Sequence, residues 1–266
     1  ALLHFPTNGL RPDDAFAAAR ALRWPGGPKL IVSVSVDGPA DVHDRLRGVA
    51  GAWQAAVATI AGLRALAGVE VYAGMTLQPG NLDAIDATVD ALDRALASSG
   101  GYCHADLHVN ILHRSDHYFG NGDVAACDAE DVGAALSAFV ARKGPPRDPV
   151  GCIERAWLEL MPAHLADGRS PVACRSGEVS AYIAPDGEVF ACTIDPRAIG
   201  SLGDFDWDLQ ALWESPRRRE LAADIGAGRC VGCWTPCEAY QTLLTRPVGL
   251  GRALLRRGRG GASREG

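Results

Sequence analysis

Hydrophobic and polar positions alternate along three segments in the first half of the chain. In residues 29–38 every second side chain is Leu or Val, and residues 69–78 and 103–112 alternate in the same way. A period of two predicts β-strands with one apolar and one polar face. A parallel sheet that is buried on both faces is usually apolar throughout. The pattern therefore predicts a sheet whose polar face lines a cavity.

Helix-like segments follow these strands along the chain. A further strand is expected at residues 2–8, and the expected helices cover residues 13–24, 50–67, 81–98 and 131–143. Alternating strands and helices predict right-handed parallel βα units. Four parallel strands do not close a barrel, and proteins usually cover an exposed sheet edge. We therefore expect an α/β fold with a partial (β/α) barrel, in a chain that is a fragment or that a partner completes.

The pattern changes near residue 145. A Pro- and Gly-rich stretch precedes a helix-like segment, two short strands flank Pro185-Asp186-Gly187 as in a hairpin, and Ser215-Pro216 begins a last helix. We expect four parts in the chain: a partial barrel over residues 1–145, a linker and helix over 146–170, a small Cys-rich α+β hairpin domain over 171–245, and a basic flexible tail over 246–266.

Composition and charge narrow the classes of partner. The net charge of −6 gives no reason to expect nucleic acid or an anionic membrane surface as a partner. No apolar run approaches the ~20 residues that span a bilayer. Six arginines follow residue 245, and we favour a solvated tail over an arm that binds polyanions. The sequence thus predicts no nucleic-acid partner and no membrane partner.

The eight cysteines point to metal binding rather than to disulfides. Five of the eight fall in the last 93 residues, and a chain of 266 residues can build its core without disulfides. Metal-binding thiolates in a reducing, cytoplasmic setting fit this distribution better. Cys103, Cys127 and Cys152 are isolated in the sequence, and we expect them to be small buried residues.

Residues 230–237 read CVGCWTPC and carry the clearest ligand pattern. A two-residue gap lets a tight turn direct two sulfurs at one metal centre. The predicted hairpin brings two further cysteines together. The candidate ligands are Cys174, Cys192, Cys230, Cys233 and Cys237. Ligation by thiolates alone suits either Zn²⁺ or an iron–sulfur cluster, and the spacing does not decide between them.

The segment CRSGEVSAYIAPDGEVFAC, residues 174–192, resembles the start of the SPASM or twitch domain of radical S-adenosylmethionine (SAM) enzymes. Gly187 followed after four residues by Cys192 fits that pattern, and CVGCWTPC looks like its continuation. A full SPASM domain carries seven cysteines and two auxiliary clusters. With five cysteines, the resemblance implies one auxiliary [4Fe–4S] cluster of the twitch type, held by four of the five.

The first half of the chain resembles the same superfamily. The motifs are TNG at residues 7–9, SVSVDGPADVHDRLRG at residues 33–48, and Thr76 with Gln78. They resemble the third, fourth and fifth barrel strands. The resemblance implies SAM or substrate binding by polar residues at these strand ends, namely Asn8, Ser35, Asp37, Arg47 and Gln78. A turn, capping or surface-charge role is the alternative for each.

Two motifs of the superfamily are not found in the sequence. The CxxxCxxC motif that holds the catalytic cluster and the Gly-Gly-Glu segment that meets SAM occur nowhere in the 266 residues. Both belong to the first two barrel strands. We therefore expect a chain whose first strands are missing, with the resemblance running from the third strand to residue 245.

The resemblance implies a radical SAM enzyme of the oxidoreductase or maturase type. In the full-length protein a second [4Fe–4S] cluster, supplied by an external electron donor, would reduce SAM to give a 5′-deoxyadenosyl radical that modifies a peptide or a small molecule. This chain alone is expected to be inactive, and no catalytic residue is identified. The alternative is a non-catalytic scaffold or binding protein with a structural zinc. An aldolase-like barrel would explain the strands but not the cysteines.

The segment 103–112 carries two histidines that could suggest a further metal site. His104 and His108, with Asp106, fall at alternating positions of the expected strand. The ~3.3 Å rise per residue places the two histidines about 13 Å apart, too far to chelate one ion. They are expected either to line the lumen and meet substrate or to face solvent.

Overall fold

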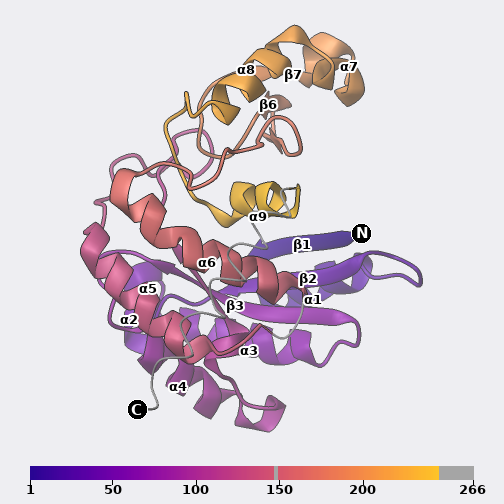
Figure 1. Ribbon diagram of the computed structural model, residues 1–266. Coiled ribbons are helices and arrows are strands. Elements are labelled where there is room, and N and C mark those ends of the chain that lie inside the picture. Colours follow the sequence, from indigo (N-terminus) through magenta and orange to yellow (C-terminus); the bar gives the residue numbers. More distant parts are fainter. Residues whose placement is uncertain (147–148, 246–266) are drawn as a thin grey trace. The chain divides into compact units, whose positions relative to one another are not determined.

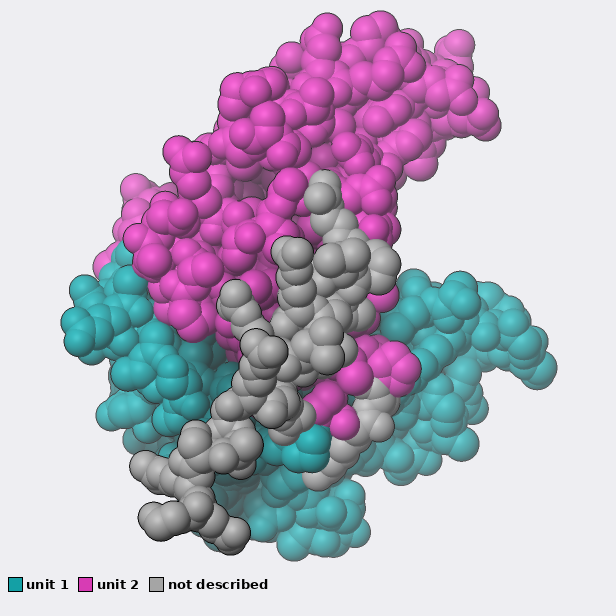
Figure 2. All heavy atoms as spheres, viewed as in Figure 1, with its two compact units in different colours: residues 1–112, 126–145 teal, residues 113–125, 146–266 magenta. Residues whose placement is uncertain are grey.

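The computed structural model describes residues 1–146 and 149–245, which form two compact units. The first unit comprises residues 1–112 and 126–145, and the second comprises residues 113–125 and those from 146 onward (Figure 2). The predicted basic tail over residues 246–266 lies outside the described residues. No helix in the described part of the chain is long and apolar enough to cross a membrane.

The first unit is built on one sheet of four parallel strands in the order β1-β2-β3-β4 (Figure 1). The strands are β1 (Leu2–Thr7), β2 (Lys29–Ser35), β3 (Val69–Leu77) and β4 (Leu107–Ile111). The order follows the sequence, as expected for consecutive right-handed βα units. The sheet is open and does not close into a barrel. The predicted α/β fold is confirmed.

Helices cover the apolar face of this sheet. They are α1 (Pro12–Ala21), α2 (Ala40–Arg47), α3 (Ala52–Arg64), α4 (Ile85–Ala95) and α5 (Ala129–Lys143), with short 3-10 turns η1 (Ala97–Ser99) and η2 (His104–Asp106). Helix α3 packs on β2 and β3, and α1 packs on α3. Alternate residues of β2, such as Leu30 and Val32, are fully buried, whereas Ser33 and Ser35 on the other face are half-buried. The sheet therefore has the two unlike faces that the alternation predicts.

The prediction of a strand beginning at residue 103 was wrong by one turn. Strand β4 begins at Leu107, and His104 to Asp106 form the turn η2. The cause is local: the Asp106 carboxylate accepts a hydrogen bond from the Cys103 N–H at 2.9 Å, which closes a tight turn. The His104 imidazole instead bonds Asp86 of α4 at 2.8 Å. His104 and His108 thus do not share a strand face.

The second unit begins with a long helix and ends with three shorter ones. Its elements are α6 (Pro149–Asp167), β5 (Tyr182–Ile183), β6 (Glu188–Phe190), β7 (Ala198–Ser201), η3 (Leu202–Phe205), α7 (Leu209–Trp213), α8 (Pro216–Gly226) and α9 (Pro236–Thr245). Strands β5 and β6 form the predicted antiparallel hairpin, and β7 adds a third strand that the sequence reasoning missed. The Ser215 hydroxyl caps α8 by accepting from the Arg218 N–H at 3.2 Å, with Pro216 at the first position as predicted.

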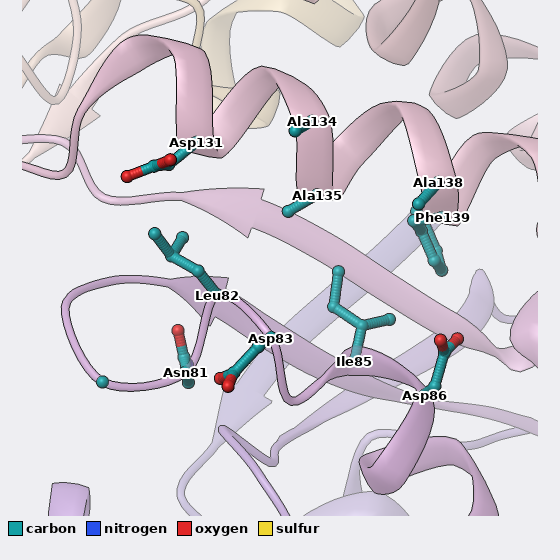
Figure 3. Close-up of a pocket in the computed structure, with 11 residues that line it drawn as sticks. Asn81, Leu82, Asp83, Ile85, Asp86, Asp131, Ala134, Ala135, Ala138 and Phe139 are labelled. Atoms are coloured by element: carbon teal, nitrogen blue, oxygen red, sulfur yellow. The ribbon is translucent and has the colours of Figure 1, made fainter.

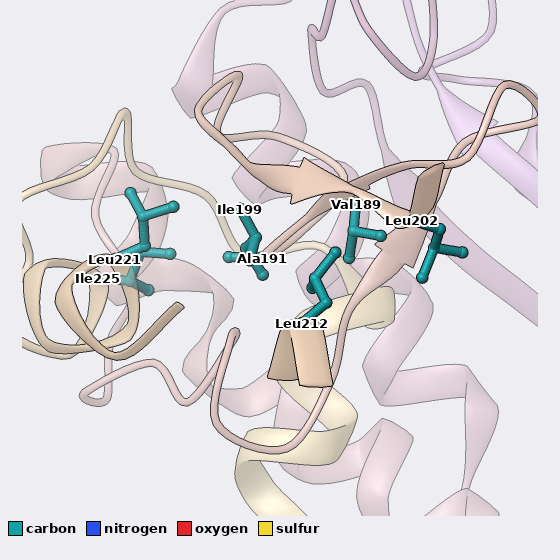
Figure 4. Close-up of a cluster of buried hydrophobic side chains, with 7 residues drawn as sticks. All are labelled: Val189, Ala191, Ile199, Leu202, Leu212, Leu221 and Ile225. Atoms are coloured by element: carbon teal, nitrogen blue, oxygen red, sulfur yellow. The ribbon is translucent and has the colours of Figure 1, made fainter. Parts of the chain in front are cut away.

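A small apolar core lies behind the hairpin of the second unit. Figure 4 shows its side chains, which come from β6, β7, the turn after them, α7 and α8: Val189, Ala191, Ile199, Leu202, Leu212, Leu221 and Ile225. Cys174 and Cys230 pack against this core. Burial of these aliphatic groups therefore fixes the backbone on which two of the candidate ligands stand.

Candidate metal centre

Four of the five predicted thiols line one pocket of the second unit. They are Cys174, Cys192, Cys230 and Cys233. Cys174 precedes the hairpin, Cys192 follows β6, and the other two lie in the turn between α8 and α9. Cys237 is exposed in the first turn of α9 and does not line this pocket.

Backbone N–H groups point at two of these sulfurs. The N–H groups of Ile194 and Asp195 donate to Cys192 Sγ at 3.4 and 3.1 Å, and the Ser176 N–H donates to Cys174 Sγ at 3.5 Å. Hydrogen bonds of this kind favour the charged form of a sulfur ligand and are among the means by which proteins tune iron–sulfur clusters. The donors are thus placed where a thiolate needs them.

Burial favours the protonated form of three of the pocket thiols. It raises the pKa of Cys192 to about 12 and also raises the pKa of Cys174 and of Cys233. A thiolate in this pocket therefore needs a nearby positive charge, which a bound metal centre supplies when it displaces the proton.

A single zinc ion and an iron–sulfur cluster place different demands on the four thiols of this pocket. Among the described residues, no group of three or more His, Cys, Asp or Glu side chains converges on a single metal position. Tetrahedral zinc, with Zn–S bonds of about 2.3 Å, would hold its thiolates roughly 3.8 Å apart. In a [4Fe–4S] cluster each cysteine binds a different iron atom, so the four sulfurs surround a larger body.

Gly232 makes the turn between Cys230 and Cys233 possible. Its φ is +79°, and a Cβ at this position would lie 2.5 Å from the carbonyl oxygen of Gly168. Only glycine adopts this backbone conformation without strain and leaves room for the neighbouring chain. The turn is held from its other side by Trp234, whose indole N–H donates to the Trp157 carbonyl at 3.0 Å.

The five predicted SAM-site residues lie near the carboxyl ends of the strands of the first unit. Asn8 follows β1, Ser35 ends β2, and Gln78 follows β3. Because the strands are parallel, these ends share one edge of the sheet. Asn8 uses its side-chain oxygen to accept from the Leu10 N–H at 3.0 Å.

The side chains of Asp37 and Arg47 form an ion pair with each other. The Asp37 carboxylate is buried, and it pairs with the Arg47 guanidinium at 2.7 Å and accepts from the Thr76 N–H at 3.3 Å. The side-chain amide of Asn81 donates to the carbonyl oxygens of Asp37 and Thr76 at 3.0 Å each. These contacts join the ends of β2 and β3, and the role of Asp37 and Arg47 in binding SAM or substrate stays a prediction.

The remaining residues of the motif close the same loop. The His43 ring accepts from the Asp37 N–H through Nδ1 at 3.0 Å. The Asp44 carboxylate accepts from the N–H groups of Gly51 and Trp53 at 2.7 and 2.8 Å, at the start of α3. The motif SxDGP with HDxxRG therefore specifies how the chain folds after β2, including the helix α2 that the sequence reasoning missed.

A larger groove in the first unit gathers none of the predicted site residues. It lies between α5 and the loop that leads into α4, with Ala134, Ala135 and Ala138 of α5 facing Leu82 and Ile85 (Figure 3). One acidic residue of the groove, Asp86, forms ion pairs with His104 and Arg142. The groove offers alanine methyl groups and a satisfied carboxylate, so we assign it no chemistry.

The three isolated cysteines are half-buried rather than buried as expected. Cys103 shows the reason at its position, because its sulfur lies at the start of the turn η2 and donates to the Asp106 carboxylate at 3.2 Å. None of the three lines the cysteine pocket.

Comparison with known proteins agrees with this geometry. Residues 174–238 match the SPASM family, described as an iron-sulfur cluster-binding domain. The matched segment starts at Cys174 and includes all five candidate ligands. No curated protein matches the sequence significantly.

Two solved structures share the fold of the chain. Native anSMEcpe with bound AdoMet and a Kp18Cys peptide matches with a TM-score of 0.51 and 12% identity, over 96% of this chain and 74% of that one. Hexahistidine-tagged anSMEcpe with bound AdoMet matches with a TM-score of 0.50 and 13% identity, over 96% and 70%. At this identity the likeness concerns the fold. Residues 174–238 thus match the SPASM family, as the cysteine spacing predicted, and the chain shares the fold of anSMEcpe.

Proposed function

We propose that the chain is a large part of a radical SAM enzyme, in which residues 174–238 hold one auxiliary [4Fe–4S] cluster of the twitch type. Its ligands are Cys174, Cys192, Cys230 and Cys233, and Cys237 is the fifth thiol left over. The observation that carries the proposal is the single pocket lined by these four thiols within the segment that matches the SPASM family. When bound, such a cluster supplies electron transfer or a place where substrate coordinates.

In the proposed reaction one electron from an external donor breaks the C5′–S bond of SAM. The products are methionine and a 5′-deoxyadenosyl radical, which takes a hydrogen atom from the substrate. Asn8, Ser35 and Gln78, at the carboxyl edge of the sheet, are the proposed contacts to SAM or substrate in this chain. The cluster that delivers the electron needs the CxxxCxxC motif, which the 266 residues do not contain. We propose that this chain by itself does not cleave SAM.

The substrate class is proposed to be a peptide in preference to a small molecule. The support is the shared fold with anSMEcpe, whose structure was solved with a bound peptide. The half-buried polar face of the sheet, with Ser33, Tyr72 and His108, offers hydrogen-bonding groups of the kind that a peptide backbone needs.

The test is anaerobic reconstitution of the chain with iron and sulfide, followed by metal analysis and visible absorption. The wild-type chain is expected to bind about four irons and to show the broad visible absorption of an iron–sulfur cluster. Cys174→Ala, Cys192→Ala, Cys230→Ala and Cys233→Ala should each lose most of the chromophore. Cys237→Ala is the matched control and should keep it, because Cys237 does not line the pocket.

Two outcomes would contradict the proposal. Stoichiometric zinc without a stable iron chromophore would make the site structural and favour the scaffold alternative. Loss of the chromophore in Cys237→Ala together with its retention in Cys230→Ala would show that the assigned ligand set is wrong.

A further inference from the structure

A buried carboxylate joins the segments that carry the cysteines. Glu238 lies in the first turn of α9, with a relative exposure of 5%. Its Oε2 accepts from the hydroxyl groups of Ser176 at 2.7 Å and Ser180 at 3.0 Å, and its Oε1 accepts from the Thr193 N–H at 3.1 Å. Hydrogen-bond donors surround it, which is the environment that a buried carboxylate needs.

The partners of Glu238 stand next to the proposed ligands. Ser176 comes two residues after Cys174, and Thr193 comes directly after Cys192. Glu238 itself lies five residues after Cys233, on the helix that the CVGCWTPC segment enters. One side chain therefore ties together three segments that are far apart in sequence. Neither its burial nor its partners could be read from the sequence.

The negative charge of Glu238 lies close to the pocket that the four cysteines line. Its hydrogen-bond donors are all neutral, and no cation forms an ion pair with it in the described part of the chain. Glu238 lines a small cavity together with Cys174 and Cys233, so its carboxylate lies close to the sulfurs of the proposed ligands. A charge that opposes a second negative charge on these sulfurs also opposes an extra electron on a centre that they hold.

We propose that Glu238 is a positioning residue of the cluster site and that its buried charge lowers the reduction potential of the cluster. The inference rests on the proposed function, because it needs a cluster in the pocket. Reduction adds one electron to the cluster, and a fixed negative charge nearby disfavours that step. The three hydrogen bonds hold the segments of Cys174, Cys192 and Cys233 in register, so the carboxylate acts on geometry and on potential together.

The experiment compares midpoint potentials of the reconstituted chain, titrated anaerobically with dithionite and followed by electron paramagnetic resonance. Glu238→Gln keeps the shape of the side chain and removes its charge. We expect reduction to become at least tenfold more favourable, a positive shift of about 59 mV for a one-electron couple. Glu238→Asp keeps the charge and should stay closer to the wild-type potential than to that of Glu238→Gln. Glu188→Gln, on the exposed side of β6, is the matched control and should not move it, because solvent screens that charge.

A Glu238→Gln chain that loads its cluster at the wild-type potential would overturn the inference. Equal positive shifts in Glu238→Gln and Glu238→Asp would overturn the charge mechanism, because both would then reflect lost geometry. Should Glu238→Gln fail to load a cluster, Ser180→Ala decides the matter. That variant leaves the neighbours of the cysteines intact and removes one donor from the carboxylate, so the potential should become more negative, and an unchanged potential would refute the proposal.

Failure of this inference can be told apart from failure of the proposed function. A wild-type chain that binds no cluster contradicts the function before any variant is measured. A wild-type chain that binds a cluster, with a potential that ignores position 238, leaves the function standing and removes only the role of Glu238.

Discussion

His108 is a neutral group on the polar face of the sheet in the first unit. Burial, together with the charges of Lys143 and His4, lowers its pKa to about 3. The edge of its ring meets Tyr72 on the neighbouring strand, with 4.1 Å between ring centres. At neutral pH the face thus presents an uncharged imidazole, which can accept or donate a hydrogen bond without bringing a positive charge into the sheet.

His108 should make the stability of the chain depend on pH. The pKa of His108 is 6.5 in the unfolded state and about 3 in the folded state. Below pH 6.5 the unfolded state therefore binds a proton that the folded state does not bind. Stability is therefore lost as the pH falls from 6.5 towards 3. Between pH 7 and pH 5, the free energy of unfolding should fall by up to about 2 kcal/mol more in wild type than in His108→Gln. Denaturant titrations at both pH values measure this, and equal losses in the two chains would contradict it.

At the scale of single residues, the sequence predicted the cysteines of the pocket but not Glu238. Cysteine side chains have few roles and a recognisable spacing, so the four thiols that line the pocket are all among the five predicted ligands. Asp37 and Arg47 were predicted from a motif. The motif does not show whether two charged residues contact a ligand or form an ion pair with each other. Glu238 gave no signal, because a glutamate after a cysteine reads as an exposed helix residue until the fold buries it.

Two tryptophans join α6 to the cysteine-bearing turn through a reciprocal pair of hydrogen bonds. The Trp157 indole N–H donates to the Trp234 carbonyl at 2.9 Å, and the Trp234 indole N–H donates to the Trp157 carbonyl at 3.0 Å. Both rings are almost fully buried. Each bond satisfies a polar group that has no access to water, so the pair specifies one register between helix and turn.

Trp157→Phe should destabilise the second unit. The change removes one donor and leaves the buried Trp234 carbonyl without its partner, which costs about 1–3 kcal/mol, and the smaller ring adds a cavity. Trp207→Phe is the control, because Trp207 is 68% exposed and its truncation should cost less than ~0.5 kcal/mol. Chemical denaturation followed by far-ultraviolet circular dichroism measures both. Equal stability of the two variants would show that the indole pair contributes nothing.

Helices and strands with a clear hydrophobic period were predicted from the sequence, whereas short elements were not. The strands of the first unit and the long helices follow the periods of 2 and 3.6 that burial imposes. Strand β7 has four residues, too few to show a period, and pairs with β6 because the fold brings them together. Helix α9 was missed although Pro236 stands at its start, the same signal that identified α8 at Pro216. Strand β4 was predicted too long, because alternation alone cannot exclude the turn η2 before it.

The division of the whole molecule was only partly visible in the sequence. Residues 113–125 belong to the second unit although the chain returns afterwards to the first. The His117 ring stacks on Phe190 with 4.4 Å between ring centres and hydrogen-bonds the Cys192 carbonyl at 3.2 Å. Contacts of this range in sequence cannot be read from local patterns. The predicted boundary near residue 145 follows from the Pro- and Gly-rich composition there.

The chain as a whole should not cleave SAM. Loaded with its auxiliary cluster and given dithionite and SAM under anaerobic conditions, it is expected to release no 5′-deoxyadenosine above a control without protein. The reason is that the 266 residues contain no CxxxCxxC motif, and the four pocket cysteines are the proposed ligands of a different cluster. Chromatography of the reaction mixture measures the product. Release of 5′-deoxyadenosine at more than one equivalent per chain would show that the pocket cluster can itself activate SAM.

The spread of the four ligands along the sequence has a consequence for how the second unit survives in a cell. A centre held by Cys174 and Cys233 at once is a cross-link that closes the chain between them. By the chain-entropy relation for disulfides, such a closure removes about 4 kcal/mol of freedom from the unfolded chain. Oxidative loss of the centre restores that freedom at once, while the thiols stay in place. Oxidation of the cluster by air should therefore first increase protease cleavage between these two cysteines. The same increase in flexibility would make the damaged protein easier to degrade.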